Sequence, residues 1–352
     1  MKKNILLSTG GTGGHILPAL SIFEHLKENF NLEIVTDKRG VKYFPNDQKF
    51  ILINTPRLKN LLLLPFNLLL VFFLIFKSIN VIKRKNIEIV ISIGGYMSLP
   101  VCLAAKILNK DIYLFEPNRV LGRANRFYLN FAKKIFVYQK DLKNFPERFV
   151  DKKIISKPLI RKEFYNVEKN SKKDNVFEIT IFGGSQGAII FDNFIKETLI
   201  KINKKIKVKV NHQTSLENTE NLKNYYSAND LNSYVFNYEN NFFNLIKNSD
   251  LCITRAGASS LAEIATLGIP FLAIPLKNSA DDHQMENAKY YEKIGCCWIL
   301  NQNEMNQKEI DDLLFKIIEN EDDYNTKKNN LKQFNENNSW KELNNKLINI
   351  FA

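Results

Sequence analysis

The stretch Ile5-Leu-Leu-Ser-Thr-Gly10-Gly-Thr-Gly-Gly-His15 begins as an apolar run and turns at once into a glycine loop. The run has the length of a β-strand, and the segment after the glycines has the apolar period of a helix. When strands and helices alternate in this way, the strands pair in parallel and the helices cover the sheet. This stretch therefore predicts an α/β fold.

The same pattern restarts in the second half of the chain, where Gly183-Gly-Ser-Gln-Gly187 follows another apolar run. The polar, charged stretch 162–175 between the two loops is typical of a linker. Apolar runs of strand length alternate with helix-period segments along most of the chain, at 5–8, 32–36, 87–93, 112–115, 135–138, 178–182, 207–211, 234–236, 251–254, 270–274 and 297–300.

The restart predicts two Rossmann-like domains whose parallel sheets face each other across a cleft. We expect an N-terminal domain over 1–160 and a C-terminal domain over 161–335. Apolar residues at helical spacing, Trp340 to Ile350, predict that 336–352 forms a closing helix that packs back on the N-terminal domain. Ligands in such sheets bind beyond the carboxyl ends of the strands, so the glycine loops are candidate binding elements.

Composition narrows the class of protein. A length of 352 residues fits two domains, and 45% hydrophobic with 25% charged residues is a globular profile. The net charge of +13 is carried mainly by lysines spread along the chain, so either a coding bias or an anionic partner explains it. Because no element interleaves basic and aromatic residues, we expect no nucleic-acid partner. The four cysteines lack metal-ligand spacing, and adjacent Cys296 and Cys297 fit a reducing cytosol.

Glycine loops that enter helices present backbone N–H groups and the positive end of a helix dipole, which favour phosphate. A third such turn, Gly94-Gly95-Tyr96, follows another strand run. Ile16 stands where a dinucleotide fingerprint requires its third glycine, and no P-loop motif is present. Oxidoreductase and nucleotide-hydrolase functions are therefore disfavoured.

His15 is the best candidate for a general base, because a helix N-terminus disfavours imidazolium and leaves the ring able to accept a proton. A helix-capping or core histidine is the alternative. The sequence has no Asp-x-Asp motif, since Asp281 and Asp282 are adjacent. We therefore expect no metal and no cofactor, with backbone N–H groups of 183–187 and 257–260 stabilising a leaving diphosphate.

The run Leu61–Phe76 is apolar nearly all round but, at sixteen residues with Pro65 and Asn67 as interruptions, falls short of a membrane span. Basic residues flank it on both sides. Part of it must be a buried core helix. An apolar patch rimmed by cations also suits shallow insertion into the anionic inner leaflet of a membrane, so we expect peripheral contact through 57–85.

Taken together, these motifs resemble the MurG family of N-acetylglucosaminyltransferases, which make the second lipid intermediate of peptidoglycan. The resemblance implies a GT-B fold, UDP-GlcNAc as donor, and inverting transfer to undecaprenyl-diphosphate-linked muramyl-pentapeptide at the cytoplasmic face of the bacterial cell membrane. Another lipid-directed UDP-sugar transferase of the same fold, such as a diacylglycerol glycosyltransferase, remains the alternative. The matching motifs run in order along the chain: 10–15, 94–96, Glu116-Pro-Asn118 with Gly122 and Asn125, 183–187, 255–263, and 282–288.

The resemblance also implies site residues. Residues of the N-terminal half would bind substrate near the donor sugar, and Glu239 would lie at the uracil. Glu263 would bind the ribose hydroxyls, and Gln284 would reach the sugar. The full set of implied substrate-binding residues is Thr12, Gly13, Gly14, Asn118, Asn125, Arg161, Ser185, Gln186, Glu239, Ala258, Ser259, Ser260, Leu261, Ala262, Glu263 and Gln284.

Overall fold

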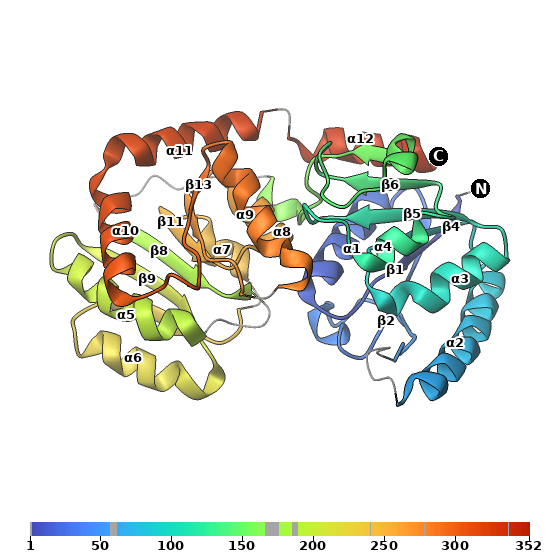
Figure 1. Ribbon diagram of the computed structural model, residues 1–352, viewed down its shortest axis with the longest axis horizontal. Coiled ribbons are helices and arrows are strands. Elements are labelled where there is room, and N and C mark those ends of the chain that lie inside the picture. Colours follow the sequence, from blue (N-terminus) through green and yellow to red (C-terminus); the bar gives the residue numbers. More distant parts are fainter. Residues whose placement is uncertain are drawn as a thin grey trace. The chain divides into compact units, whose positions relative to one another are not determined.

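A computed structural model describes residues 2–56, 62–165, 176–184, 189–239, 241–277, 279–336 and 338–352. The chain divides into two compact units. The first comprises 1–162 together with 338–352, and the second comprises 163–337. Each unit holds one parallel sheet with helices on its faces (Figure 1). The two predicted α/β halves with parallel sheets are therefore confirmed.

The sheet of the first unit has seven strands in the order β3-β2-β1-β4-β5-β6-β7. Strands β1, β2, β4, β5 and β6 correspond to predicted runs, whereas the short strands β3 and β7 at the two edges were not predicted. The bounds are β1 Asn4–Ser8, β2 Asn31–Thr36, β3 Ile51–Leu52, β4 Ile89–Ser92, β5 Asp111–Glu116, β6 Lys134–Val137 and β7 Lys153–Ile155.

One layer of helices in this unit shares a core with the sheet, since Ile82, Val101 and Tyr128 belong to a single buried cluster and the partly buried Phe149 packs against it. These residues come from α2, α3, α4 and the short 3-10 helix η3. The bounds in the unit are α1 Gly13–Leu26, η1 Val41–Tyr43, α2 Leu64–Arg84, η2 Tyr96–Ser98, α3 Leu99–Ile107, α4 Arg123–Tyr128, η3 Glu147–Lys152, η4 Lys162–Phe164 (which ends in the second unit) and α12 Trp340–Phe351.

The last helix, α12, returns to the first unit and packs beside α1. The His25 ring stacks on Trp340 at 3.5 Å between centroids, and its Nδ1 lies 3.2 Å from Asn344 Oδ1. Burial lowers the pKa of His25 to about 4. Phe351 is buried and contacts the Tyr113 ring of β5. The C-terminal segment is thus part of the first unit's core.

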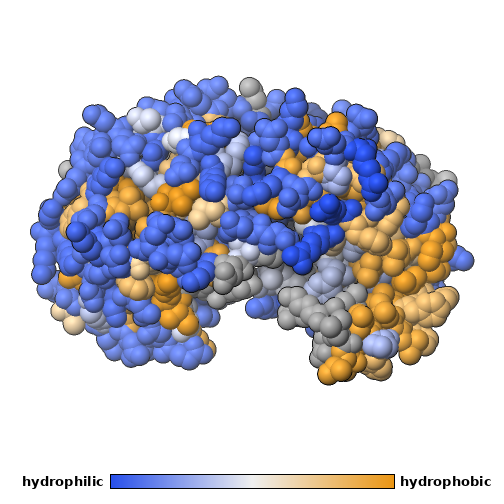
Figure 2. All heavy atoms as spheres, in the orientation of Figure 1, coloured by the Kyte–Doolittle hydropathy of each residue, from blue (hydrophilic) through white to orange (hydrophobic). Residues whose placement is uncertain are grey.

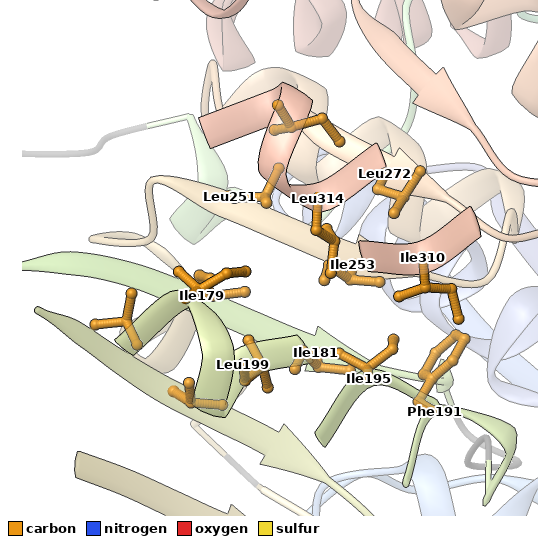
Figure 3. Packing of buried hydrophobic residues seen from close by; sticks show 14 of the residues in the cluster. Ile179, Ile181, Phe191, Ile195, Leu199, Leu251, Ile253, Leu272, Ile310 and Leu314 are labelled. Carbon is orange, nitrogen blue, oxygen red and sulfur yellow. The ribbon is translucent and has the colours of Figure 1, made fainter. Parts of the chain in front are cut away.

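The second unit has a six-stranded sheet in the order β10-β9-β8-β11-β12-β13. Figure 3 shows Ile179, Ile181, Leu251 and Ile253 of its central strands packed against α5 and α10. The bounds are β8 Phe177–Phe182, β9 Val208–Gln213, β10 Asn232–Phe236, β11 Leu251–Thr254, β12 Phe271–Ala273, β13 Cys297–Ile299, α5 Ile189–Asn203, η6 Leu216–Asn218, α6 Thr219–Ser227, α7 Phe242–Ile246, α8 Ala258–Thr266, η7 Ala280–Asp282, α9 His283–Lys293, α10 Gln307–Glu319 and α11 Glu321–Phe334.

The prediction that Pro65 and Asn67 interrupt the apolar run was wrong. Helix α2 begins at Leu64 with Pro65 in its first turn, where the missing N–H costs nothing, and it continues for 21 residues to Arg84. Asn67 is buried rather than a break. The first part of the predicted membrane segment, 57–61, lies outside the described residues.

Candidate functional site

Each sheet has a topological switch point, where the strand order reverses: between β1 and β4 in the first unit and between β8 and β11 in the second. Ligands in open α/β sheets bind outside the carboxyl ends of the strands at such points. The glycine loops 10–15 and 94–96 follow β1 and β4. Gly183 and Gly184 follow β8, and Gly257 follows β11. The predicted loops therefore lie where ligands bind in this fold class.

His15 lies in the first turn of α1, half-buried. Its Nδ1 is 3.1 Å from the carbonyl oxygen of Ile93, which can only accept a hydrogen bond. In the neutral ring the proton therefore sits on Nδ1, and Nε2 carries the lone pair. A Cβ on Gly95, which has φ +79, would lie 3.6 Å from Nε2. The glycine turn thus lets the backbone pass close to the basic nitrogen.

One amide of the first glycine loop, that of Gly11, is already occupied by the carboxylate of Asp37, at the end of β2. Its buried carboxylate accepts hydrogen bonds from Gly11 N at 2.9 Å and Gly40 N at 3.0 Å, and it pairs with Arg39. The Arg39 guanidinium also lies over the Tyr96 ring, 5.2 Å from its centroid. Because a carboxylate already fills the anion position at Gly11, this amide is not available to a phosphate.

A second buried carboxylate, Glu116, organises the loop after β5. Its two oxygens accept from Asn118 N and Nδ2 at 3.2 and 3.0 Å, from Gly122 N at 2.9 Å and from Asn125 Nδ2 at 3.0 Å. Burial raises the pKa of this carboxyl, and the N–H donors oppose the shift. Asn118 and Asn125, both predicted to bind substrate, are therefore held by one side chain.

Asn125 connects this loop to the glycine turn after β4. Its side chain is buried, and Nδ2 also donates to Phe115 O at 3.1 Å. A Cβ on Gly94, which has φ +88, would lie only 3.1 Å from Nδ2. Among the described residues, Asn125 Oδ1 has no hydrogen-bond partner although it is buried, so it is an acceptor that a substrate could satisfy.

The remaining predicted residues of the first unit lie around α1 and the unit boundary. Thr12 is the N-cap of α1 and its carbonyl accepts from His15 N at 3.1 Å. Gly13 and Gly14 are the first residues of the helix. Arg161, half-buried, precedes η4 and belongs to the first unit. The residue before Arg161 is tied to α1, because the carbonyl oxygen of Ile160 accepts a hydrogen bond from Ser21 Oγ of that helix at 2.7 Å.

In the second unit, helix α8 begins directly after the loop that follows β11, with Gly257 as N-cap. The predicted nucleotide-binding residues Ala258, Ser259, Ser260, Leu261, Ala262 and Glu263 form its first turns. The Ser259 hydroxyl is buried and, among the described atoms, lacks a hydrogen-bond partner. Glu263 is buried rather than on a solvated helix face.

Two neighbouring elements support this helix start. Asn287 Nδ2 of α9 donates to Ala256 O at 3.1 Å. Arg255 is buried and donates to Ile274 O at 3.1 Å and to Gln302 Oε1 at 2.8 Å, which gives it a structural role. The loop before α8 is therefore braced on both sides.

Gln284, at the start of α9, and Glu239, after β10, each accept hydrogen bonds from residues nearby in the sequence. Gln284 Oε1 accepts from Leu276 N at 2.9 Å. Glu239 accepts from Tyr234 Oη at 3.1 Å and from Asn241 N at 2.8 Å. The predicted phosphate contacts Ser185 and Gln186 lie outside the described residues.

Sequence reasoning missed the Asp37–Arg39 pair and the anchoring role of Glu116. The signal for Asp37 was its position directly after a strand that neighbours β1. It also missed a buried network in which His212 Nδ1 contacts Tyr226 Oη at 2.7 Å and Nε2 contacts Asp192 at 3.2 Å. His212 lies within β9, one residue beyond the predicted run 207–211. Within the described ranges, no group of three His, Cys, Asp or Glu side chains could hold a metal ion.

Helix α2 carries the largest run of exposed apolar side chains that we describe. Phe66, Phe72, Phe73 and Phe76 are each more than half exposed, at 60, 53, 59 and 55%. Figure 2 shows the resulting apolar surface over α2 at the lower right of the molecule. By length and composition α2 is long and apolar enough to cross a membrane, and a packed helix of a soluble protein can pass the same test.

Comparison with known proteins shows the family and the fold of the chain. The N-terminal and C-terminal domain models of glycosyltransferase family 28 match residues 5–137 and 178–343. A solved structure of Acinetobacter baumannii MurG superposes with a TM-score of 0.77 at 22% identity, covering 100% of this chain and 99% of that one. A UDP-GlcNAc 2-epimerase from Neisseria meningitidis bound to UDP-GlcNAc shares the fold at a TM-score of 0.63 and 14% identity, covering 93% of this chain and 94% of that one.

Two curated relatives carry the same name, UDP-N-acetylglucosamine–N-acetylmuramyl-(pentapeptide) pyrophosphoryl-undecaprenol N-acetylglucosamine transferase. The protein from Rickettsia bellii is 36% identical over 94% of this chain and 95% of its own length. The protein from Pelagibacter ubique is 44% identical over 99% of both chains. The chain therefore belongs to this family of N-acetylglucosamine transferases, within glycosyltransferase family 28.

Proposed function

We propose that this protein transfers N-acetylglucosamine from UDP-GlcNAc to the C4 hydroxyl of undecaprenyl-diphosphate-linked muramyl-pentapeptide, with inversion at the sugar. The observation that carries the proposal is 44% identity, along 99% of both chains, to a transferase named for this donor and this acceptor. The glycine loops at the switch point of each sheet supply the kind of site that such a reaction needs.

In this reaction the acceptor oxygen attacks C1 of the sugar while the bond from C1 to the diphosphate oxygen breaks. His15 Nε2 takes the proton from the attacking hydroxyl, because the contact of Nδ1 with Ile93 O leaves the lone pair on Nε2. Asn125 Oδ1 orients the acceptor, and the side chain of Asn118 contacts the donor sugar. The hydrogen bonds that Glu116 accepts from Asn118 and Asn125 keep these two side-chain amides in place.

The donor belongs to the second unit. Backbone N–H groups at the start of α8, together with the helix dipole, stabilise the negative charge that develops on the leaving UDP. Glu263 accepts hydrogen bonds from the ribose hydroxyls, as acidic residues do in dinucleotide sites. We expect transfer without a tightly bound metal. Abolition of single-turnover activity by a chelator would contradict this expectation.

The test is transfer of labelled sugar to a short-chain acceptor analogue by the wild type, His15→Ala and Glu263→Ala. Loss of a general base lowers kcat by about 100-fold or more, whereas loss of the ribose contact raises the donor KM. Glu217→Ala, on an exposed carboxylate of the same unit, is the matched control. Preference for UDP-galactose or UDP-glucose over UDP-GlcNAc would instead favour a different lipid-directed sugar transferase.

We also propose that the enzyme lies on the anionic cytoplasmic face of the cell membrane through α2. The helix lies against the protein rather than standing apart from it, since Val71, Ser78 and Ile82 are buried. Each half-exposed phenylalanine has roughly 100 Å² left to bury, which at ~25 cal/mol per Å² contributes about 2.5 kcal/mol on insertion. The basic residues Lys77, Lys83 and Arg84 add attraction to anionic lipid.

Flotation with anionic vesicles tests this contact. We expect Phe72→Ser/Phe73→Ser to lower the bound fraction strongly, and Leu216→Ser, which changes an exposed side chain of the second unit, to leave it unchanged. Binding that depends neither on lipid charge nor on these phenylalanines would remove the proposal.

A further inference from the structure

A cluster of polar side chains, most of them buried, surrounds the first turn of α5, the helix that follows the glycine loop 183–187 in the sequence. At its centre is the carboxylate of Asp192, in that first turn. Asp192 Oδ2 accepts from Thr214 Oγ1 and from Asn218 Nδ2 at 2.8 Å. Asp192 Oδ1 lies 3.2 Å from His212 Nε2, and His212 Nδ1 lies 2.7 Å from Tyr226 Oη. The proposed reaction uses none of these side chains.

The carboxylate at the centre is ionised. Burial alone would raise the pKa of Asp192, but its contacts with His212, Thr214 and Asn218 outweigh burial and hold the pKa below its ordinary value. An ionised carboxylate can only accept, so the proton of a neutral His212 ring lies on Nε2, and Nδ1 accepts from the Tyr226 hydroxyl. Nε2 and Oδ1 are close but poorly aligned for a hydrogen bond. Removing the carboxylate would leave several buried donors unpaired.

The first turn of α5 also contacts the hydrophobic core and the approach to α8. Phe191, the residue before Asp192, is buried in one cluster with Ile181 and Ile195 (Figure 3). The guanidinium carbon of Arg255 lies 5.1 Å from the centroid of the Phe191 ring. Arg255 stands directly before the loop that leads into α8. A shift of the first turn of α5 would therefore disturb this loop as well.

The carboxyl end of β9 connects the cluster to the glycine loop and to the segment after β10. Gln213, next to Thr214, accepts from Gly183 N at 3.1 Å and donates to Asn237 O at 3.1 Å. Asn237 Nδ2 donates in turn to Thr214 O at 3.0 Å. Gly183 begins the glycine loop, and Asn237 stands two residues before Glu239, which is expected at the uracil. The segment that holds the carboxylate thus also fixes the backbone at two places expected to contact the donor.

We infer that Asp192 and His212 are positioning residues for the nucleotide donor. The inference rests on the proposed function, in which the second unit holds UDP-GlcNAc. Because Asp192 and His212 are almost fully buried, they act through the backbone of α5 and β9 rather than by touching the donor. Backbone N–H groups stabilise a leaving diphosphate only when they are held in place before the reaction, and this cluster holds the segments that carry them.

The test measures binding of UDP by calorimetry and transfer kinetics with each substrate varied in turn. Asp192→Ala leaves the donors around it without an acceptor and loosens the first turn of α5. The Kd of UDP and the donor KM should rise by about 10- to 100-fold, while the acceptor KM stays unchanged. Asp192→Asn keeps one acceptor oxygen and turns its NH₂ group to His212, whose proton moves to Nδ1 and faces Tyr226 Oη. This variant should recover most of the lost donor affinity.

The matched control is Asp311→Ala, because Asp311 accepts from Thr198 and Lys201 in the later turns of the same helix. It should lower the midpoint of thermal unfolding and leave the Kd of UDP unchanged. An equal loss of UDP affinity in this control would reduce the role of Asp192 to stability and overturn the inference. Should Asp192→Ala not fold, Thr214→Val removes one donor from the carboxylate and is measured in the same way.

The two readouts separate this inference from the proposed function. Wild-type UDP affinity in Asp192→Ala, or in Thr214→Val in its place, overturns the inference and leaves the proposed function intact. A loss in Asp192→Asn as large as that in Asp192→Ala would assign the effect to charge rather than position and also overturn the inference. A wild type that binds UDP but transfers no sugar to the acceptor overturns the proposed function, whereas weaker UDP binding in Asp192→Ala still supports the positioning role. A wild type that does not bind UDP overturns both.

Discussion

Replacing Glu116 with glutamine tests whether one buried carboxylate holds the acceptor side of the site together. The carboxylate accepts four N–H donors, two from Asn118 and one each from Gly122 and Asn125. Glutamine offers one acceptor oxygen where the carboxylate offers two. Two of the four N–H donors therefore face its NH₂ group and lose their acceptor. Hydrogen bonds to a charged group are worth about 1.5–3 kcal/mol each, so this loss is about 4 kcal/mol.

A second effect of the substitution, of opposite sign, reduces this loss of stability. Burial raises the pKa of Glu116, which means that ionising it in the folded protein costs free energy, and glutamine removes this cost. A carboxyl with a raised folded pKa contributes most stability below its ordinary range, and the contribution is lost as the pH rises through the raised pKa. We therefore expect a net loss of about 2 kcal/mol near neutral pH and a flatter stability profile as the pH rises from 4 to 7.

The kinetic consequence is larger than the loss of stability. Displacement of Asn118 and Asn125 by a fraction of an ångström to one ångström lowers kcat/KM for both the acceptor and the donor by about 100-fold. Steady-state kinetics with each substrate varied in turn, together with thermal unfolding, measure both effects. Glu24→Gln, on an exposed carboxylate of the same unit, is the control. Unchanged acceptor kinetics and stability in Glu116→Gln would refute the reasoning.

Three further changes test the first unit, all by thermal unfolding. Asp37→Asn removes the carboxylate that accepts from Gly11 N and should cost about 3 kcal/mol; a wild-type midpoint would contradict its role. Gly40→Ala places a Cβ 2.9 Å from Ile16 Cδ1 and should cost about 1–3 kcal/mol. Because burial lowers the pKa of His25 to about 4, the neutral ring is favoured in the fold, and stability falls by about 2 kcal/mol as the pH drops from 7 to 5. His25→Gln should lack that fall, and an equal fall in this variant would exclude His25 as its source.

The fold was predictable because the strands of a buried parallel sheet are short apolar runs, and those runs alternate with helices along this sequence. The predicted run 178–182 became β8 Phe177–Phe182, and the run 251–254 became β11 Leu251–Thr254. The edge strands β3 and β7 escaped prediction because strands of two and three residues are too short to show a period. Pro65 was misinterpreted as a break because the sequence does not say which turn of a helix a proline occupies.

The site was less predictable, because the sequence shows the glycine loops but not the side chains that accept hydrogen bonds from their amides. The loops after β1 and β8 look alike as sequence. In the structure, Gly11 N donates to the carboxylate of Asp37, which comes from a different strand. Gly183 N instead donates to the neutral amide oxygen of Gln213 at 3.1 Å.

This difference supports the proposal that the leaving nucleotide diphosphate binds to the second unit. In the first unit, two buried carboxylates at the carboxyl ends of strands, Asp37 and Glu116, already accept hydrogen bonds from the backbone N–H groups of Gly11 and Gly122. At the start of α8 in the second unit, the Ser259 hydroxyl and the helix dipole favour an anion instead. Two glycine loops of nearly the same sequence thus differ in the side chains that neighbouring strands bring to them. A glycine motif therefore predicts a close approach of the backbone, and the charge beside it determines which group approaches.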